Sequence, residues 1–153
     1  MPIVAKTDLE YLQMALDEAI AAGEAGEVPV GAVLVHQGEV LARAQNRVMR
    51  DSDPTAHAEV VALRAAGQAL GNYRLNGCSL FVTLEPCSMC AGALVHARVD
   101  RVVYATADPK AGAAGSVLTV INHPRLNHQM QLDSGLLAEE SSELLKAFFR
   151  ERR

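Results

Sequence analysis

The chain has 153 residues, of which half are hydrophobic and 21% are charged, so its size and composition are those of one folded globular domain. No apolar run approaches the roughly 18 residues of a membrane span, and the N-terminal segment lacks the pattern of a secretory signal. We therefore expect a cytoplasmic protein with no membrane partner. The net charge of −4 argues against coating of duplex DNA. Residues 146–153, with four basic side chains against one acidic, could still hold a short nucleic-acid segment.

The chain contains no Gly/Ser- or Pro-rich linker, no low-complexity segment and no evident internal repeat, so we expect a single domain over residues 1–153. Thr7 and Glu10 have the spacing of a capping box at the start of a helix. Apolar residues at helical intervals follow them, and Gly23 or Gly26 can end this first helix.

Two short extended stretches come next, at 30–35 and 40–44, and the turn residues between them predict a β-hairpin. The remaining pattern predicts helices over 57–70, 87–97 and 136–150, and strands over 80–84, 102–105 and 129–132. Helices that separate strands indicate a layered α/β domain. The opening hairpin makes its sheet mixed rather than purely parallel.

Three cysteines are an odd number for a disulfide framework, and two of them form Cys87-x-x-Cys90. Without a secretory signal, this spacing favours metal binding or redox chemistry. Pro86 is suited to the opening of a helix, and the first turn of that helix would then present both sulfurs on one face. The helix dipole favours thiolates there. Cys78 alternates with apolar residues of a strand, and we expect it in the core.

His57 is the best candidate for a third ligand, because it also opens a helix and no fourth Cys or His stands at ligand spacing nearby. Three protein ligands and a water are the pattern of a catalytic zinc, whereas a structural zinc normally has four protein ligands. Glu59 could take a proton from the bound water and pass it to a leaving group. His-x-Glu followed by Pro-Cys-x-x-Cys is the known signature of zinc-dependent nucleobase deaminases.

With both motifs present, the chain resembles the bacterial tRNA-specific adenosine deaminases, a branch of the cytidine-deaminase-like superfamily. The zinc motif is common to the superfamily, and the flanking segments point to the tRNA branch. The resemblance covers nearly all of the chain and runs through 28–33 (Val-Pro-Val-Gly-Ala-Val), 46–47 (Asn-Arg), 53–59 (Asp-Pro-Thr-Ala-His-Ala-Glu), 72–75 (Asn-Tyr-Arg-Leu), 83–87 (Thr-Leu-Glu-Pro-Cys) with 89–93 (Met-Cys-Ala-Gly-Ala), 112–116 (Gly-Ala-Ala-Gly-Ser) and 127–128 (Asn-His).

The resemblance implies a three-layer α/β/α fold with a central mixed five-stranded sheet, one zinc ion per subunit and a homodimer. It implies hydrolytic conversion of adenosine to inosine at the wobble position of an arginine tRNA anticodon. The zinc ligands would be His57, Cys87 and Cys90, with Glu59 as the proton shuttle. The implied substrate-binding residues are Val30 and Asn46 in the base pocket, then Ala58 and Pro86, and near the anticodon loop Asp108, Lys110, Phe149, Arg150 and Arg152.

The reaction that follows is a hypothesis about Glu59, which would deprotonate the zinc-bound water and then protonate N1 and the departing amino group of the adenine. The base must leave its stack, which costs less in an anticodon loop than in a duplex. Phe148 fits the apolar face of the terminal helix, which leaves Phe149 free to stack on a base. Arg152 and Arg153 could either contact RNA or form a solvated tail.

Three other functions stay open. Cys-x-x-Cys at a helix start is also the layout of thiol–disulfide oxidoreductases, although His57 and Glu59 would then have no role. A non-catalytic, zinc-stabilised RNA-binding subunit would have no need of Glu59. A deaminase of a free base or nucleoside, of the guanine or cytidine type, would share the whole zinc motif.

Overall fold

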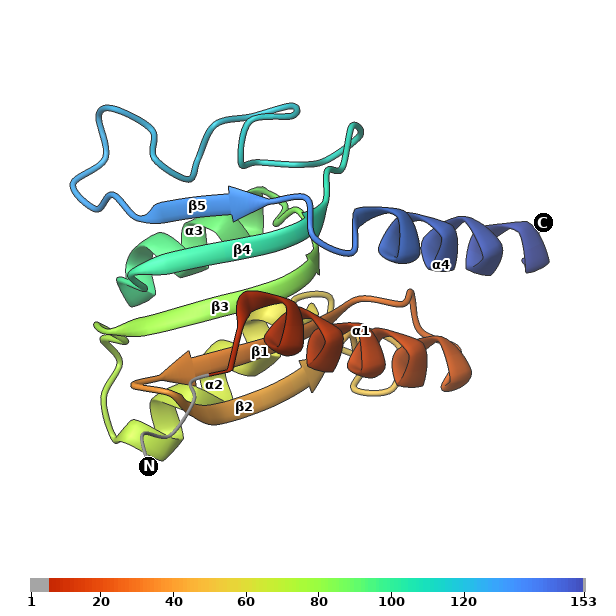
Figure 1. Ribbon diagram of the computed structural model, residues 1–153, viewed down its shortest axis with the longest axis horizontal. Helices are drawn as coiled ribbons and strands as arrows, with labels where there is room; N and C mark the ends of the chain where they lie inside the picture. The colour runs from red at the N-terminus through yellow and green to blue at the C-terminus, as the bar shows by residue number, and fades with distance from the viewer. Residues whose placement is uncertain (1–5, 153) are drawn as a thin grey trace.

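The computed structural model describes residues 6–152, and its centre is one mixed sheet with the strand order β2-β1-β3-β4-β5 (Figure 1). β1 pairs antiparallel with both β2 and β3, whereas β3, β4 and β5 run parallel. The strands are β1 Gly31–His36, β2 Glu39–Gln45, β3 Cys78–Leu84, β4 Arg101–Thr106 and β5 Gln131–Ser134. The helices are α1 Asp8–Glu24, α2 Ala58–Leu70, α3 Ser88–Ala97 and α4 Ala138–Glu151.

The helices cover both faces of the sheet, which confirms the expected α/β/α layers (Figure 1). The larger apolar cluster lies between the sheet and the small side chains of α2 and α3, and it includes Cys78 as expected. The smaller cluster joins α1 to the opposite face, where Tyr11 and Phe81 pack with their ring centroids 4.9 Å apart. The last helix, α4, follows β5 and extends beyond the end of the sheet (Figure 1).

The local signals of the N-terminal half are confirmed. The hydroxyl of Thr7 accepts a hydrogen bond from the backbone of Glu10, whose carboxylate in turn accepts one from the backbone of Thr7, so α1 begins with a capping box. The helix ends at Glu24, and Gly26 follows with φ +86°. The hairpin of β1 and β2 forms at the expected place, and Gly71 ends α2 in the left-handed conformation.

Several boundaries differ from the expectation by one or two residues, and two of these differences have a clear physical cause. The last strand begins at Gln131 rather than at residue 129, because both backbone groups of Met130 bond the side-chain amide of Asn122 instead of a strand. Pro86 does not open α3, since the helix begins at Ser88 with Cys87 as its N-cap. Pro86 stays extended because its carbonyl accepts a hydrogen bond from Ala113 at 2.8 Å, next to a bridge between Cys87 and Gly112.

Gly31 allows α1 to approach the sheet closely. A Cβ at this position would lie 2.0 Å from the carbonyl oxygen of Ala15 and 2.6 Å from the amide nitrogen of Ala19. Both are backbone atoms of a helix, so they cannot turn aside as a flexible side chain could. Within residues 6–152, no helix is long and apolar enough to cross a membrane.

We expect Gly31→Ala to destabilise the protein by about 3 kcal/mol, because the added methyl group must push α1 off the sheet. Denaturant unfolding of both proteins measures the difference. Gly92→Ala is the matched control, since a Cβ there meets no atom within 4 Å and Gly92 lies inside α3. The control should leave stability unchanged or raise it by up to about 1 kcal/mol. Equal stabilities of the two variants would contradict the close approach of α1.

Candidate active site

Two helix N-termini meet at the candidate active site. His57 is the N-cap of α2 and Cys87 is the N-cap of α3, and neither side chain bonds the backbone of its own helix as an N-cap usually does. Cys90 lies one turn further along α3 and is fully buried. The side chains that open these two helices are therefore free to turn toward each other.

His57, Cys87 and Cys90 form the cluster that the spacing predicted. The Nδ1 atom of His57 lies 3.6 Å from Sγ of Cys87 and 3.5 Å from Sγ of Cys90, and all three ligand atoms lie within 4.8 Å of one another. Ligands about 2.0–2.3 Å from a tetrahedral zinc are roughly 3.5 Å apart, so these separations fit such an ion. One imidazole and two thiolates are a donor set that zinc prefers, and they leave a fourth position open.

The ionisation of the two thiols is strongly linked. A hydrogen bond from Cys90, supported by His57, lowers the pKa of Cys87 to about 3. The same contact, together with burial, raises the pKa of Cys90 far above its ordinary value, because a second thiolate would face the first. The hydrogen bond to Cys87 also raises the pKa of His57. A divalent cation would remove the repulsion between the two thiolates, since it stabilises both thiolates and the neutral imidazole at the same time.

Glu59 lies in the first turn of α2 and is almost fully buried. Burial is the main cause that raises its pKa to about 7, with a smaller contribution from Cys87 in the same direction and an opposing one from His57. Glu59 and His57 line the same cavity. A buried carboxyl group beside the cluster is therefore placed to exchange protons with a molecule in that cavity.

The cavity next to the cluster has a volume of about 210 Å³. Since pockets for drug-sized ligands begin at about 300 Å³, this one suits a single ring system. Its walls include four of the expected substrate-binding residues: Val30, Asn46, Ala58 and Asp108. Pro86 does not line it. The remaining wall residues, which the sequence analysis did not select, are Val28, Leu84, Glu85 and Ala111.

A larger groove of about 830 Å³ adjoins this cavity, and both share Val28, Leu84 and Asp108. The groove is lined by the other expected RNA contacts, namely Lys110, Phe149, Arg150 and Arg152. The structure thus brings together residues that lie about 40 positions apart in the sequence. Arg153 lies outside the described residues.

The two aromatic residues at the end of α4 divide as the sequence analysis expected. Phe148 is buried, whereas Phe149 is 49% exposed and meets the ring of Phe148 edge-on at a centroid distance of 5.5 Å. The guanidinium of Arg152 lies 3.5 Å from the centroid of Phe148 and donates a hydrogen bond to its carbonyl oxygen. Arg152 is therefore held against the helix, while the ring of Phe149 stays accessible.

Glu85 organises the loop that carries Asp108 into the cavity. Its buried carboxylate accepts hydrogen bonds from the amides of Asp108 at 3.0 Å, Ala114 at 2.9 Å and Ser116 at 3.2 Å, and from the hydroxyl of Ser116. Burial alone would raise the pKa of Glu85, but these donors hold it below its ordinary value. Gly112 packs directly on the carboxylate, where a Cβ would lie 2.3 Å from the carboxyl carbon.

Residues 6–153 match the family model of the MafB19-like deaminases. The chain is 49% identical over 143 residues to the tRNA-specific adenosine deaminase of Bacillus subtilis (strain 168), an alignment that covers 94% of this chain and 89% of that one. The chain belongs to this deaminase family. The family membership and the fold that the motifs implied are thereby confirmed.

Two solved structures place the deaminase among proteins that act on different bases. One comes from studies of A-to-I editing by tRNA:A34 deaminases at the wobble position of transfer RNA. It matches with a TM-score of 0.86 and 48% identity, covering 89% of this chain and 99% of that one. The other is a guanine deaminase from Bacillus subtilis, with a TM-score of 0.66, 34% identity and 95% of each chain covered.

We expect the deaminase to bind one zinc ion per chain and Cys87→Ser to lose most of it, because a hydroxyl group replaces one thiolate ligand. Metal analysis of the purified proteins measures the content. Cys78→Ala is the matched control, since Cys78 is buried in the core and takes no part in the cluster. A Cys87→Ser protein that still holds a full equivalent of zinc would contradict the assignment.

Proposed function

We propose that this deaminase converts adenosine to inosine, by zinc-dependent hydrolysis, at the wobble position of a tRNA anticodon, and that arginine tRNA is its substrate. The observation that carries the proposal is the cavity itself. His57, Cys87 and Glu59 line a space of single-base size that opens into a groove with exposed aromatic and basic side chains. The relative from Bacillus subtilis is named a tRNA-specific adenosine deaminase, and the similar solved structure comes from work on A-to-I editing at the wobble position, which supports the same substrate here.

The roles of the residues follow from their positions. His57, Cys87 and Cys90 would hold the zinc ion. Bound there, zinc would supply a nucleophile at neutral pH by lowering the pKa of water. Glu59 would accept one proton from the attacking water and deliver it to N1 of the adenine while the water oxygen bonds to C6. It would then take the second proton from the new hydroxyl group at C6 and pass it to the amino group, whose bond to C6 breaks. Water and adenosine thus become inosine and ammonia.

The groove would hold the RNA on either side of the target base. Phe149 offers an exposed ring on which a neighbouring base can stack, and Lys110 and Arg150 offer charges for the phosphates. Only one base fits the inner cavity, so the target must leave its stack. An anticodon loop allows this at lower cost than a duplex, which supports a tRNA stem-loop as partner rather than DNA duplex.

The second candidate function is deamination of a free base, which the likeness to a solved guanine deaminase favours. A free base would occupy the inner cavity and make no use of Phe149 or Arg150 in the outer groove. A non-catalytic RNA-binding subunit has less support. Burying the carboxyl group of Glu59 in the cavity wall costs free energy, and RNA binding alone does not require a buried carboxyl group there.

We also propose that the protein acts as a cytoplasmic homodimer with one zinc per subunit, each subunit being one domain over residues 1–153. An apolar groove of about 780 Å³ between α2 and α3 supports a contact between copies. It is lined in part by Leu63, Gly67, Tyr73 and His96, and the ring of Tyr73 is largely exposed.

Zinc-loaded protein should form inosine on an arginine anticodon stem-loop with adenosine at the wobble position. We expect Glu59→Gln to lower kcat at least about 100-fold with its zinc content unchanged, because the amide cannot carry the proton. Glu39→Gln, an exposed carboxylate at the β-hairpin, is the matched control and should keep full activity. Turnover of guanine but not of the stem-loop would favour the second candidate function. Full turnover by Glu59→Gln would disprove the shuttle.

Phe149→Ala should raise KM for the stem-loop about 5- to 160-fold and leave kcat nearly unchanged, since stacking on one base contributes about 1–3 kcal/mol. Steady-state kinetics on the same stem-loop measure both constants. Leu9→Ala is the control, because Leu9 is 48% exposed but lies on α1, outside the groove. Equal KM values for Phe149→Ala and Leu9→Ala would mean that α4 does not contact the RNA.

A further inference from the structure

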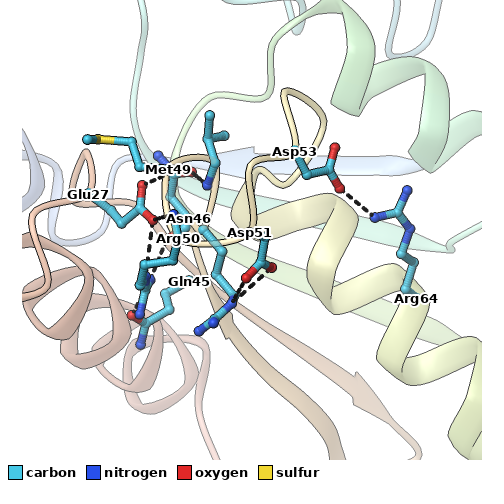
Figure 2. A network of polar contacts seen from close by, with 10 residues as sticks. Glu27, Gln45, Asn46, Met49, Arg50, Asp51, Asp53 and Arg64 are labelled. Atoms are coloured by element: carbon cyan, nitrogen blue, oxygen red, sulfur yellow. Dashed lines mark hydrogen bonds and ion pairs between the residues drawn. The ribbon is translucent and has the colours of Figure 1, made fainter.

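Another buried carboxylate, Glu27, directly precedes the cavity residue Val28 and has no part in the chemistry described so far. Its side chain is 1% exposed. The end of α1 fixes its backbone, because the amide of Glu27 donates to the carbonyl oxygen of Ala22 at 2.9 Å across Gly26. The carboxylate therefore starts from a rigid point and reaches toward the turn that follows β2 (Figure 2).

Glu27 bonds the backbone of that turn, residues 46–50, at two successive amides. One carboxylate oxygen accepts from the amide of Met49 at 3.0 Å, and the other accepts from the amide of Arg50 at 2.9 Å and from its Nε at 3.0 Å. Burial alone would raise the pKa of Glu27, but these donors hold it below its ordinary value, so the group is ionised at neutral pH. Removing one partner of such a buried pair costs far more than breaking an exposed one.

Arg50 extends the same network to Asn46. Its Nη2 donates to Oε1 of Gln45 at 2.8 Å and to the backbone carbonyl of Asn46 at 2.6 Å (Figure 2). The guanidinium thus connects the buried carboxylate of Glu27 directly to the residue that lines the cavity. Because a guanidinium is planar and presents its donors in a fixed fork, it sets direction as well as distance.

The side chain of Asn46 is oriented by the same elements. Its Nδ2 donates to the carbonyl oxygen of Val28, the residue after Glu27, at 3.3 Å. Its Oδ1 accepts from the amide of Val48 at 3.1 Å. These contacts fix which end of the amide faces which way, and they leave one N–H and one lone pair of Asn46 for a ligand in the cavity. A shift of the turn would change the directions in which this N–H and this lone pair point.

We propose that Glu27 and Arg50 are positioning residues for the base pocket: through the turn 46–50 they set the direction in which Asn46 presents its donor and acceptor to the target base. The proposal rests on the proposed function of the cavity. Other charges of this region do not serve the same purpose. Arg47 and Asp51 pair on the surface, both about 40% exposed, and contribute little to the geometry of the turn.

The test is a double-mutant cycle of Glu27 with Asn46. Glu27→Gln places an NH₂ group opposite an N–H donor of the turn, so we expect kcat/KM to fall about 100-fold, as for a misplacement of about 1 Å. In an Asn46→Ala background the same substitution should cost less than about threefold, because the group it positions is gone. Asp51→Asn, at the position directly after the turn, is the matched control and should keep wild-type kinetics.

Additive losses in the cycle would overturn the proposal, as would a loss of zinc from Glu27→Gln, since either would mean a general effect on the fold.

Arg50→Lys provides a second test if Glu27→Gln does not fold. It keeps the positive charge beside Glu27 but removes the fork to Asn46, and we expect the same non-additive loss. Wild-type protein is assayed in parallel. If the wild-type protein deaminates a free base and not the stem-loop, the proposed function fails. The double-mutant cycle is then measured with that base as the substrate.

Discussion

The meeting of two helix N-termini is the constraint on which the rest of the site depends. An N-cap side chain usually bonds its own helix, which is worth about 1 kcal/mol. His57 and Cys87 forgo these bonds and face each other at 3.6 Å, with Cys90 beside them. The thiols crowd one another, and a metal ion offsets both costs by binding all three groups. The packing of α2 and α3 on one face of the sheet therefore brings together a cluster whose donor set and spacing fit a zinc ion.

Buried carboxylates hold the two irregular walls of the cavity. Glu85 bonds the loop that carries Asp108, and Glu27 bonds the turn that carries Asn46. Each accepts backbone N–H groups that no strand or helix supplies with a partner, so the loops gain fixed positions without regular structure. The cavity is lined by the start of α2 and by loop residues, two of which, Asn46 and Asp108, lie on segments bonded by these carboxylates. Such rigidity suits a site where small displacements cost much activity.

Recognition of the larger substrate has a different physical basis. The groove beside the cavity is formed by α4 and by the loop after β4, and its side chains are mostly exposed. Substitutions of Phe149 and Arg150 in this groove therefore need not disturb the core. Relatives that share the fold also act on free guanine, as the solved guanine deaminase does by its name. The guanine deaminase shares the fold over 95% of each chain, so the fold alone does not set the preference between an RNA and a free base.

Most of the elements and the metal cluster were predictable from the sequence because their causes are local. The capping box at Thr7, the hairpin and the helix ends depend on residues a few positions apart, and Cys87 and Cys90 are one helical turn apart. His57 was the remaining candidate ligand at a helix start, and Glu59 followed from the His-x-Glu motif. The three members of the cluster were therefore predictable from the sequence, and the structure confirms that they meet. The predicted start of α3 was wrong by one residue and that of β5 by two, because Ala113 and Asn122 compete from distant loops.

The tertiary structure alone decided the rest. Nothing in the local pattern around Glu27 or Glu85 shows that a carboxylate is buried there, since acidic residues after a helix or strand are usually solvated. Their partners lie more than 20 positions away, and only the folded chain brings those amides together. Val28 and Leu84 join the two cavities for the same reason. Long-range contacts create these buried environments, so they cannot be predicted from the residue and its sequence neighbours.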